Sequence, residues 1–390
     1  MNPKIRNVAG LAMMALSAMA WSAEGDKAAP VAPGAPEVAA APAPVAGKPL
    51  VQIAILLDTS GSMGGMIKQA QTQLWAIVNE FATARRDGQK PILQVALYQY
   101  GTPSLGVDNG YIKQLLPLTD DLDKVSEALF KLRDNGGDEY CGWVIQDAVR
   151  DLKWSPSPKD YKAIFIAGNE SFAQGKVDFH ESCKAAIAKG IIVNTIHCAG
   201  AEDTCWADGA RLADGQFMRI DGTRTVVEVK APQDAELAKL NGELNKTYIA
   251  YGRAGRESML RQQAMDQSSS SLGSGVLAKR AYSKANAQYR NTDWDMVDAA
   301  KDGKLKVEEM KAEELPEEMR KMTVDERKAF VAAKEKERAD VQAKIQKLAK
   351  DRDAFVAAEM KKNANTDTLG EKVQGAVREQ ATKQGFLFEK

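Results

Sequence analysis

Residues 51–63 read VQIAILLDTSGSM, and this stretch is the strongest indication of the fold. Its apolar run at 53–57 is typical of a strand that is buried on both faces of a parallel sheet. Asp58 follows this run directly, and Ser60 and Ser62 come after it at alternate positions. Ligands of open parallel sheets bind at the carboxyl ends of strands, near the topological switch point. One carboxylate and two hydroxyls at that place offer three oxygen ligands to a hard divalent cation such as Mg²⁺.

Around this stretch, short apolar runs alternate with amphipathic segments of helical length, from residue 51 to residue 220. The alternation predicts an α/β fold with a doubly wound, mostly parallel sheet and helices on both of its faces. We expect strands at 51–57, 92–100, 111–115, 162–167, 191–197 and 216–220. We expect helices at 66–86, 122–132, 142–152, 178–189, 204–212 and 233–247. A charged, mainly helical C-terminal region follows.

The strand, the D-x-S-x-S loop and the following helix together resemble the start of von Willebrand factor A domains, where this loop is the metal-ion-dependent adhesion site. The resemblance extends in strand and helix order to about residue 222. Three further segments, NGGDEYCG (135–142), IFIAGNE (164–170) and NTIHC (194–198), resemble a bacterial secreted or periplasmic subgroup with a C-terminal helical region. The resemblance implies a Rossmann-like fold and a protein-binding function in which a partner's carboxylate often completes the metal coordination.

The resemblance also implies a threonine ligand from a second loop and an aspartate ligand from a third, but the sequence departs from both. Acidic residues replace the threonine at 135–139, and the third loop reads AGN at 167–169. If the neighbouring acidic side chains turn inward, the site holds Mg²⁺, with Ca²⁺ or Mn²⁺ as alternatives; if they face solvent, it is vestigial. We predict retained binding because the first loop is intact. The predicted ligands are Asp58, Ser60, Ser62, Asp138, Glu139 and Glu170.

The surroundings of the predicted site leave several alternatives open. The loop after Asp58 also suits a polar turn that caps the helix beginning near residue 66. Thr119 and Asp120 are available near the rim, but they precede a different helix. The loops at the carboxyl ends of the predicted strands, which we call the loop set, carry further aromatic, histidine and cysteine residues. Such residues either anchor a partner or, more commonly, pack in the core. These residues are Tyr140, Cys141, Phe172, His197, Cys198 and Trp206.

The four cysteines, Cys141, Cys183, Cys198 and Cys205, permit up to two disulfides in an oxidising compartment. Cys141 and Cys198 both fall close to the carboxyl edge of the predicted sheet. If any disulfide forms, we therefore expect it between Cys141 and Cys198. The cysteine spacings match no zinc signature, because His197 and Cys198 together with Cys205 lack a convincing fourth ligand.

The ends of the chain predict export and a two-part organisation. Residues 1–20 combine basic residues, a short apolar stretch and the small-residue end Ala-Met-Ala, which is typical of a cleaved signal peptide. An Ala/Pro-rich linker follows at 21–48. We then expect a von Willebrand factor A domain at 49–250 and a helical region at 251–390. No later stretch is apolar enough for a transmembrane helix, so the prediction is a periplasmic or secreted protein.

The charged tail carries three further patterns. The Ser- and Gly-rich stretch at 268–275 predicts a flexible interruption. A 4-3-7 apolar seam is formed by Val341, Ile345, Leu348 and Phe355. The next apolar position of this spacing would be 352, but Arg352 stands there. Two imperfect heptads are too few for a coiled coil, so we expect a helical hairpin that folds back on itself or on the first domain. Residues 298–309 partly match an EF-hand loop, but Ala300 replaces an oxygen donor, so we expect a simple Asp-Gly turn.

The charge balance and the lack of catalytic motifs argue against several classes of function. The 53 Lys and Arg offset 53 Asp and Glu, so no net field favours nucleic acid or an anionic membrane. With only His180 and His197, and without nucleophile-elbow, zinc-protease or phosphate-loop motifs, the chain is not expected to be an enzyme. We predict a non-enzymatic module that binds protein partners in the bacterial envelope. The alternatives are a structural or chaperone-like envelope component that binds through its helical tail and, less favoured, a metal-dependent hydrolase.

Overall fold

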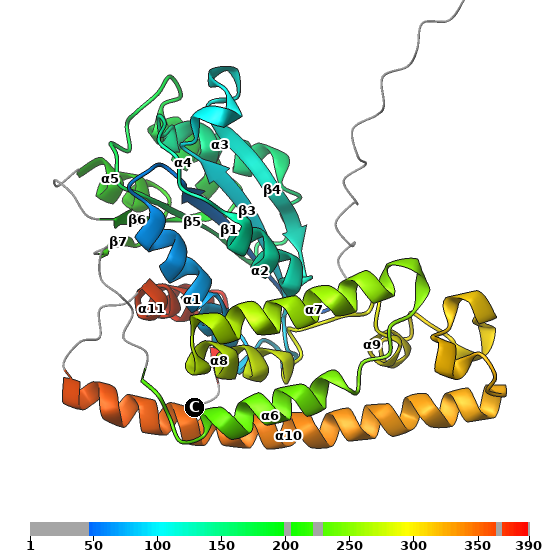
Figure 1. The fold of residues 1–390 in the computed structure, drawn as a ribbon. Helices are drawn as coiled ribbons and strands as arrows, with labels where there is room; N and C mark the ends of the chain where they lie inside the picture. The colour runs from blue at the N-terminus through cyan, green and yellow to red at the C-terminus, as the bar shows by residue number, and fades with distance from the viewer. Residues whose placement is uncertain (1–46, 199–203, 221–228, 364–368, 389–390) are drawn as a thin grey trace, which may run out of the picture. The chain divides into compact units, whose positions relative to one another are not determined.

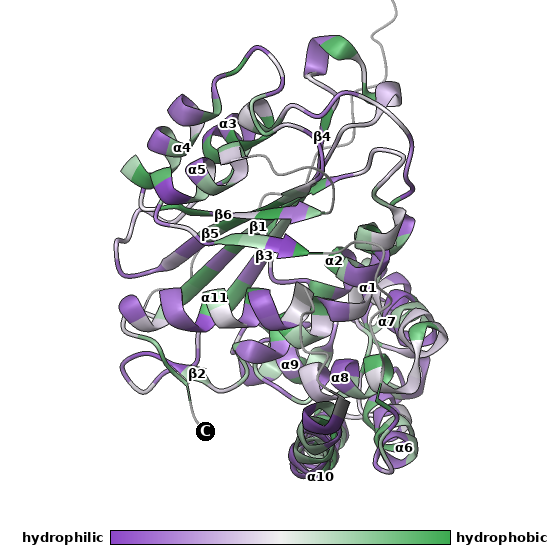
Figure 2. Ribbon diagram, turned by 90° about the vertical axis from the view of Figure 1, so that its left-hand side faces the viewer, coloured by the Kyte–Doolittle hydropathy of each residue, from purple (hydrophilic) through white to green (hydrophobic). Residues whose placement is uncertain are grey.

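A six-stranded sheet in the order β4-β3-β1-β5-β6-β7 organises the computed structural model, which describes residues 47–198, 204–220, 229–363 and 369–388 (Figure 1). The strands are β1 (Leu50–Asp58), β3 (Ile92–Tyr100), β4 (Ile112–Thr119), β5 (Tyr161–Gly168), β6 (Ile192–Cys198) and β7 (Phe217–Ile220). Neighbouring strands are parallel except β3 and β4. The predicted mostly parallel sheet is confirmed, and hydrophobic residues concentrate along its central strands (Figure 2).

Helices cover both faces of this sheet, so the predicted doubly wound arrangement is confirmed. The helices of one face are α3 (Cys141–Asp151), α4 (Phe179–Ala188) and α5 (Thr204–Leu212). Those of the other face are α1 (Gly64–Glu80), α2 (Leu122–Lys131) and α11 (Leu369–Lys383). Each face has its own core: Ala54 and Ile166 belong to the first, and Val51 and Phe165 to the second. Alternate residues of a buried strand thus serve opposite cores.

β4 is longer than the strand expected at 111–115. It extends to Thr119, and a short loop at 101–111 joins it to β3, so the two strands are antiparallel. Thr119 pairs with Val95 in the first half of β3, whereas Asp58 pairs with the last residue of that strand. The prediction that Thr119 and Asp120 lie near the rim of the metal site is therefore wrong.

α1 ends at Glu80, earlier than the predicted helix at 66–86. Phe81 follows it and is fully buried. The short strand β2 (Ala84–Arg85) then pairs antiparallel with β8 (Leu387–Phe388). The partner strand lies more than 300 residues away in the sequence, so the local amphipathic pattern cannot predict where this helix ends.

The C-terminal region is helical, as predicted. Its other helices are α7 (Gly252–Leu272), α8 (Ser274–Lys284), α9 (Met296–Lys301) and α10 (Val324–Asn363). α6 (Asp234–Asn245), the helix expected at 233–247 at the end of the first domain, packs against α8 and α10. The 3₁₀ turns η3 (Val307–Glu309), η4 (Ala312–Glu314) and η5 (Glu317–Met319) follow α9. The turns η1 (Pro103–Leu105) and η2 (Val107–Asn109) lie in the loop between β3 and β4. The predicted flexible interruption at 268–275 is wrong, because only Gly273, with a φ of 148°, separates α7 from α8. Ser269 is fully buried, so packing keeps this Ser-rich turn helical.

α10 is one continuous helix of 40 residues that packs against α6 and α8. Its seam residues Val341 and Ile345 belong to the same core as β1 and α1. Arg352, at the gap in the seam, is buried and pairs with Asp234 of α6 at 2.7 Å. The tail therefore folds back on the rest of the protein, as predicted. No helix in the described ranges is long and apolar enough to span a membrane.

The Asp-Gly pattern at 298–309 forms a turn, as predicted. Gly303 has a φ of 69° at the end of α9. The Asp298 carboxylate accepts a hydrogen bond from Arg338 at 2.8 Å, and Asp302 pairs with Arg290. Both carboxylates are therefore occupied by arginines of the protein itself, rather than arranged around a calcium ion.

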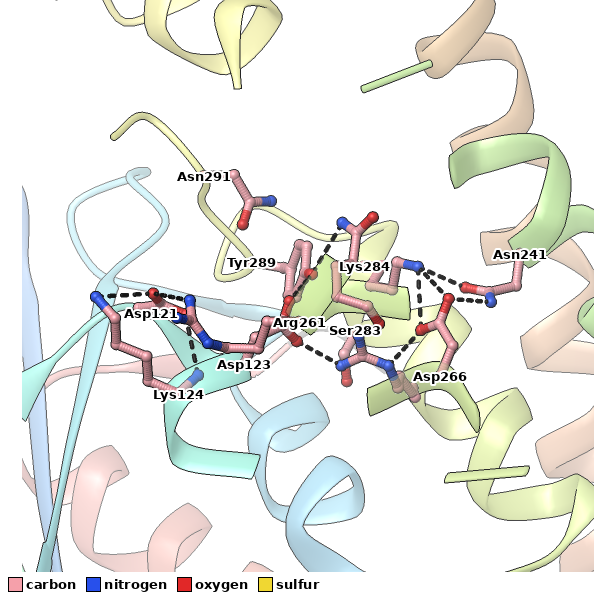
Figure 3. A network of polar contacts seen from close by, with 12 residues as sticks. Asp121, Asp123, Lys124, Asn241, Arg261, Asp266, Ser283, Lys284, Tyr289 and Asn291 are labelled. Atoms are coloured by element: carbon pink, nitrogen blue, oxygen red, sulfur yellow. Dashed lines mark hydrogen bonds and ion pairs between the residues drawn. The ribbon is translucent and has the colours of Figure 1, made fainter. Parts of the chain in front are cut away.

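A buried network of charged residues joins α2 to the tail helices (Figure 3). Arg280 of α8 has no exposed side-chain surface and contacts Asp123 of α2 at 2.7 Å and Asp266 of α7 at 2.5 Å. Lys284 lies 3.0 Å from Asp266. The described residues form one compact unit, in which the sheet and the helical region share a core. The predicted signal peptide and most of the predicted linker lie outside the described residues.

Candidate cation site

Asp58 lies at the carboxyl end of β1, where the strand order reverses between β3 and β5, and its side chain is fully buried. The Ser60 amide donates to Asp58 Oδ1 at 2.7 Å, and the Ser60 hydroxyl donates to Oδ2 at 3.2 Å. The Thr59 amide donates to the Tyr100 carbonyl at 2.9 Å, and its hydroxyl lies 2.7 Å from that of Thr102. These hydrogen bonds hold the first loop against the end of β3.

Glu139 of the second loop lies beside Asp58, and only 3% of Glu139 is exposed. Both side chains border Gly101, whose φ is +80°. A Cβ atom at this position would lie 2.6 Å from Asp58 Oδ1 and 3.0 Å from Glu139 Cγ. A larger residue would therefore displace both carboxylates. The second loop is held in place because the Asn135 amide donates to the Thr59 carbonyl at 2.8 Å.

The two carboxyl groups share a buried site at the end of β1. Burial raises the pKa of Asp58 to about 7, against hydrogen bonds from Ser60, and the charge of Glu170 adds to the rise. Burial also raises the pKa of Glu139 to about 8, with the charges of Asp58 and Glu170 as further causes. Within the described part of the chain, neither group pairs with a lysine, arginine or histidine. Desolvation and like charge both favour the protonated acids, so a cation would relieve both costs.

Asn169 of the third loop contributes an amide oxygen. It directly follows β5, in the loop where the family resemblance implies an aspartate ligand. Ser62 Oγ donates to Asn169 Oδ1 at 3.1 Å and lies 3.3 Å from Ser60 Oγ. The sequence analysis did not name Asn169 as a ligand because its side chain is uncharged, although its place in the third loop pointed to it. The sequence analysis also did not identify Gly101, which directly follows β3 and leaves room for the Asp58 and Glu139 side chains.

Asp138 and Glu170 are exposed and do not join the buried group. The Asp138 carboxylate accepts from the Tyr140 hydroxyl at 3.5 Å. Glu170 is anchored through its main chain, since its carbonyl accepts from Trp206 Nε1 at 2.9 Å. Its charge acts on the site from a longer distance. The predicted ligands that the structure brings together are Asp58, Ser60, Ser62 and Glu139.

The donor set fits a hard divalent cation. It consists of two carboxylates, two hydroxyls and one amide oxygen, which are ligand types that Mg²⁺ and Ca²⁺ accept, as does Mn²⁺. Across residues 47–198, 204–220, 229–363 and 369–388, no group of three or more His, Cys, Asp or Glu side chains could hold a metal. A cation at Asp58 and Glu139 would therefore depend on the neutral oxygens of the first and third loops.

Most other residues of the loop set belong to the core. Phe172 and Trp206 are fully buried, with ring centroids 4.7 Å apart. His197 is buried beside Trp206, with ring centroids 5.4 Å apart. Tyr140 alone of the six residues named for this loop set stays partly exposed. Packing is therefore the role of most of them, and only Tyr140 is available to a partner.

Cys141 and Cys198 are not joined by a disulfide. Cys141 packs into the core on the α3 face, whereas Cys198 packs into the core on the α1 face. The sheet separates their side chains, so the disulfide that the sequence favours is absent. The sequence could not reveal this, because both residues lie near one edge of the sheet but on opposite faces.

Comparison with known proteins gave matches among solved structures alone. No protein-family model and no curated protein matches the chain. Proximal thread matrix protein 1 from the mussel byssus, with a zinc-occupied MIDAS motif, has a TM-score of 0.37 and 14% identity over 45% of this chain and 43% of that protein. BatB from Bacteroides thetaiotaomicron has a TM-score of 0.34 and 18% identity, over 44% of this chain and 90% of BatB.

The pilus adhesin SpaC from Lactobacillus rhamnosus GG has a TM-score of 0.34 and 15% identity, over 45% of this chain and 28% of the adhesin. The chain thus spans less than half of the mussel protein and of the adhesin that it matches. Its own strand order, with β1 beside β3 and β5, places the D-x-S-x-S loop at the switch point of the sheet. By this topology, residues 50–198 and 204–220 have a doubly wound α/β fold of the von Willebrand factor A type, with further helices packed on the same sheet.

Proposed function

We propose that the protein is a non-enzymatic protein-interaction module that binds partners at the carboxyl edge of its sheet. A divalent cation held there would organise the contact surface. The observation that carries this proposal is the pair of buried carboxyl groups, Asp58 and Glu139, which lie side by side without a positive partner among the described residues. Leaving two such groups uncompensated costs stability, and binding a cation would remove that cost.

The chain's own oxygens would bind and orient the cation. Asp58 and Glu139 would supply charge, and Ser60 and Ser62 would supply hydroxyl oxygens. Asn169 would supply a neutral amide oxygen from the third loop, so the two carboxylates would be the charged ligands of the site. We favour Mg²⁺, with Ca²⁺ and Mn²⁺ as alternatives, because all donors are hard oxygens. The cation would in turn offer an open coordination position to a partner's carboxylate.

A binding role fits the site better than catalysis. His180 lies on the surface and pairs with Asp178, and His197 is enclosed in the core beside Trp206. Neither is placed as a general base beside Asp58. We also propose that the protein works in the periplasm or outside the cell, with envelope proteins as partners. The competing role, a component with a vestigial site that binds through its helical tail, is an outcome of the tests below.

Mg²⁺ is expected to raise the melting temperature of the purified protein, because a ligand that binds only the folded state stabilises it by about 2.7 kcal/mol at 100 times its Kd. The substitutions Asp58→Asn and Glu139→Gln should abolish this rise. Both variants should fold at least as well as the wild type without Mg²⁺, since each removes a buried charge. Asp138→Asn is the matched control, because Asp138 is exposed in the same loop. Differential scanning calorimetry with and without chelator measures the effect.

An equal rise in the wild type and in Asp58→Asn would place the bound cation elsewhere. No rise with Mg²⁺, Ca²⁺ or Mn²⁺ would leave the site vestigial. Crosslinking in native envelopes would then decide between the two binding roles. Recovery of the same partners by wild type and Asp58→Asn would favour the helical tail as the binding element.

Cation affinity is expected to rise with pH. The pKa of Asp58 is about 7 and that of Glu139 about 8, so both groups must release protons to hold a cation. Both values lie above the ordinary 3.8 and 4.5, so these groups favour the cation-free fold most below pH 4 and destabilise it as the pH rises toward 8. We expect the Mg²⁺ affinity to increase by at least about tenfold from pH 6 to 8 by isothermal titration calorimetry. An affinity that stays constant over this range would contradict the assignment of these two ligands.

A further inference from the structure

We propose that Tyr111, Tyr140 and Trp143 form a docking surface for a basic segment of a partner protein, which places a lysine or arginine side chain over the aromatic rings. We call these three residues the aromatic cluster. The inference rests on the proposed protein-binding function and names the chemistry of the partner. It does not depend on the cation, because the cluster lies beside the buried carboxyl groups rather than among them.

The aromatic cluster is assembled from two separate parts of the loop edge. Tyr111 ends the loop between β3 and β4, Tyr140 caps α3, and Trp143 lies in the first turn of that helix. Ring centroids lie 5.6 Å apart for Tyr111 and Tyr140, and 6.3 Å apart for Tyr140 and Trp143, whose planes are parallel within 1°. All three side chains remain partly exposed, unlike the buried Phe172 and Trp206.

The backbone is shaped to accept these rings. A Cβ atom on Gly110 would lie 2.5 Å from Trp143 Cε3, and one on Gly175 would lie 2.6 Å from Tyr140 Cδ1. Tyr111 itself has a φ of +56°, which is rare and costly for a bulky residue. Val107, on the same loop, is 57% exposed. Partly exposed aromatic side chains are enriched at protein interfaces, where their large surface anchors a partner.

The charge around the aromatic cluster favours a cationic ligand. The loops at 101–111, 133–140 and 169–178 carry five exposed acidic residues but only two exposed basic residues, within the described chain. The acidic residues are Asp108, Asp134, Asp138, Glu170 and Asp178. Asp138 is close to the rings, since its carboxylate accepts from the Tyr140 hydroxyl at 3.5 Å. A basic segment would therefore meet both complementary charge and aromatic faces.

Lys176 shows that a ring of the cluster accommodates an ammonium group. Its Nζ atom lies 4.2 Å from the centroid of the Trp143 ring, and the residue is exposed. The contact is a cation–π interaction, which strengthens when water is excluded. A partner's lysine or arginine would take the place of Lys176 over the ring, with the rim acids compensating its charge. The loop edge thus already displays, within one chain, the contact that we assign to the partner.

Titration of the full chain with a fluorescently labelled lysine- and arginine-rich peptide, in the presence of chelator, tests the proposal by fluorescence anisotropy. We expect saturable binding that weakens with salt, and at least tenfold weaker binding of a glutamate-rich peptide of equal length. Trp143→Leu should weaken binding of the basic peptide by about five- to thirtyfold, in line with a cation–π contact of 1–2 kcal/mol. Asp138→Lys should weaken it as well, and as an exposed position it carries little risk to folding.

Leu260→Ser is the matched control, because Leu260 is 56% exposed on α7, outside the three loops, and it should bind like the wild type. Binding of the basic peptide that is unchanged by both Trp143→Leu and Asp138→Lys would overturn the proposal, as would equal binding of the acidic peptide. The cation proposal fails separately: basic-peptide binding that persists in chelator, together with no thermal response to Mg²⁺, would retain the docking surface and reject the cation.

Discussion

A chain that ends at residue 363, and so lacks α11, is expected to lose its cooperative unfolding transition. α11 and the residues after it bury five apolar side chains against the sheet and α1. These are Val373, Ala376, Val377, Ala381 and Phe386. Burial of the two valines and the phenylalanine alone is worth roughly 5–9 kcal/mol, which is comparable to the whole stability of a typical protein.

Removal of α11 would also break hydrogen bonds with the sheet, in addition to exposing apolar side chains. Gln380 of α11 accepts a hydrogen bond from the buried Tyr161 hydroxyl at 2.8 Å and exchanges two hydrogen bonds with Asn194. Without the helix, these strand residues would lose their partners. As a milder variant, Val377→Asp should also unfold the protein, whereas Glu379→Gln, on the exposed side of the same helix, should not. A truncated chain with the wild-type melting temperature by circular dichroism would show that α11 is not part of the core.

Replacing Arg280 by methionine is expected to destabilise the protein by about 3–5 kcal/mol. Arg280 is completely buried and pairs with Asp123 of α2 and Asp266 of α7. Its removal would leave Asp123 with a hydrogen bond from Tyr289 and Asp266 with Lys284, but without the guanidinium between them. Urea unfolding followed by circular dichroism measures the change as a lower midpoint with an unchanged slope.

Arg261→Met is the matched control. Arg261 of α7 also pairs with α2, through Glu127 at 2.9 Å, but this pair is partly exposed. Exposed pairs contribute at most about 1 kcal/mol, so the control should lie close to the wild type. Equal effects of the two substitutions would contradict the view that burial of the Arg280 network joins the helical region to the sheet.

The parts of the fold that the sequence predicted correctly are those with a local signal. The strand at 51–57 and the helix at 204–212 follow from apolar periodicity, and the structure places elements at both. The end of α1 and the packing of α11 could not be predicted, because their partners lie at the opposite end of the chain. The Ser-rich stretch at 268–275 resembled a linker in composition, yet burial of Ser269 keeps it helical.

The residues of the candidate site also fall into those that a local pattern predicts and those that depend on distant contacts. Asp58, Ser60 and Ser62 are fixed by one local loop, and the structure brings them together. In the second loop, neighbouring acidic residues point to different environments: Glu139 is buried and Asp138 is exposed. Nothing in the local pattern distinguishes the two, since the choice depends on how the loop crosses the end of β3. Spacing alone could predict acidic residues near the cation, but not which of them contributes.

The assignment of a cation to Asp58 and Glu139 is tested most directly by the anomalous difference map of crystals grown at pH 8 with Mn²⁺. We expect one strong peak within bonding distance of an oxygen of Asp58, with Glu139 as the second carboxylate beside it. The same peak should be absent from crystals of Asp58→Asn. A fully ordered loop without a peak, or a peak bound by Asp138 or Glu170 in place of Glu139, would contradict it.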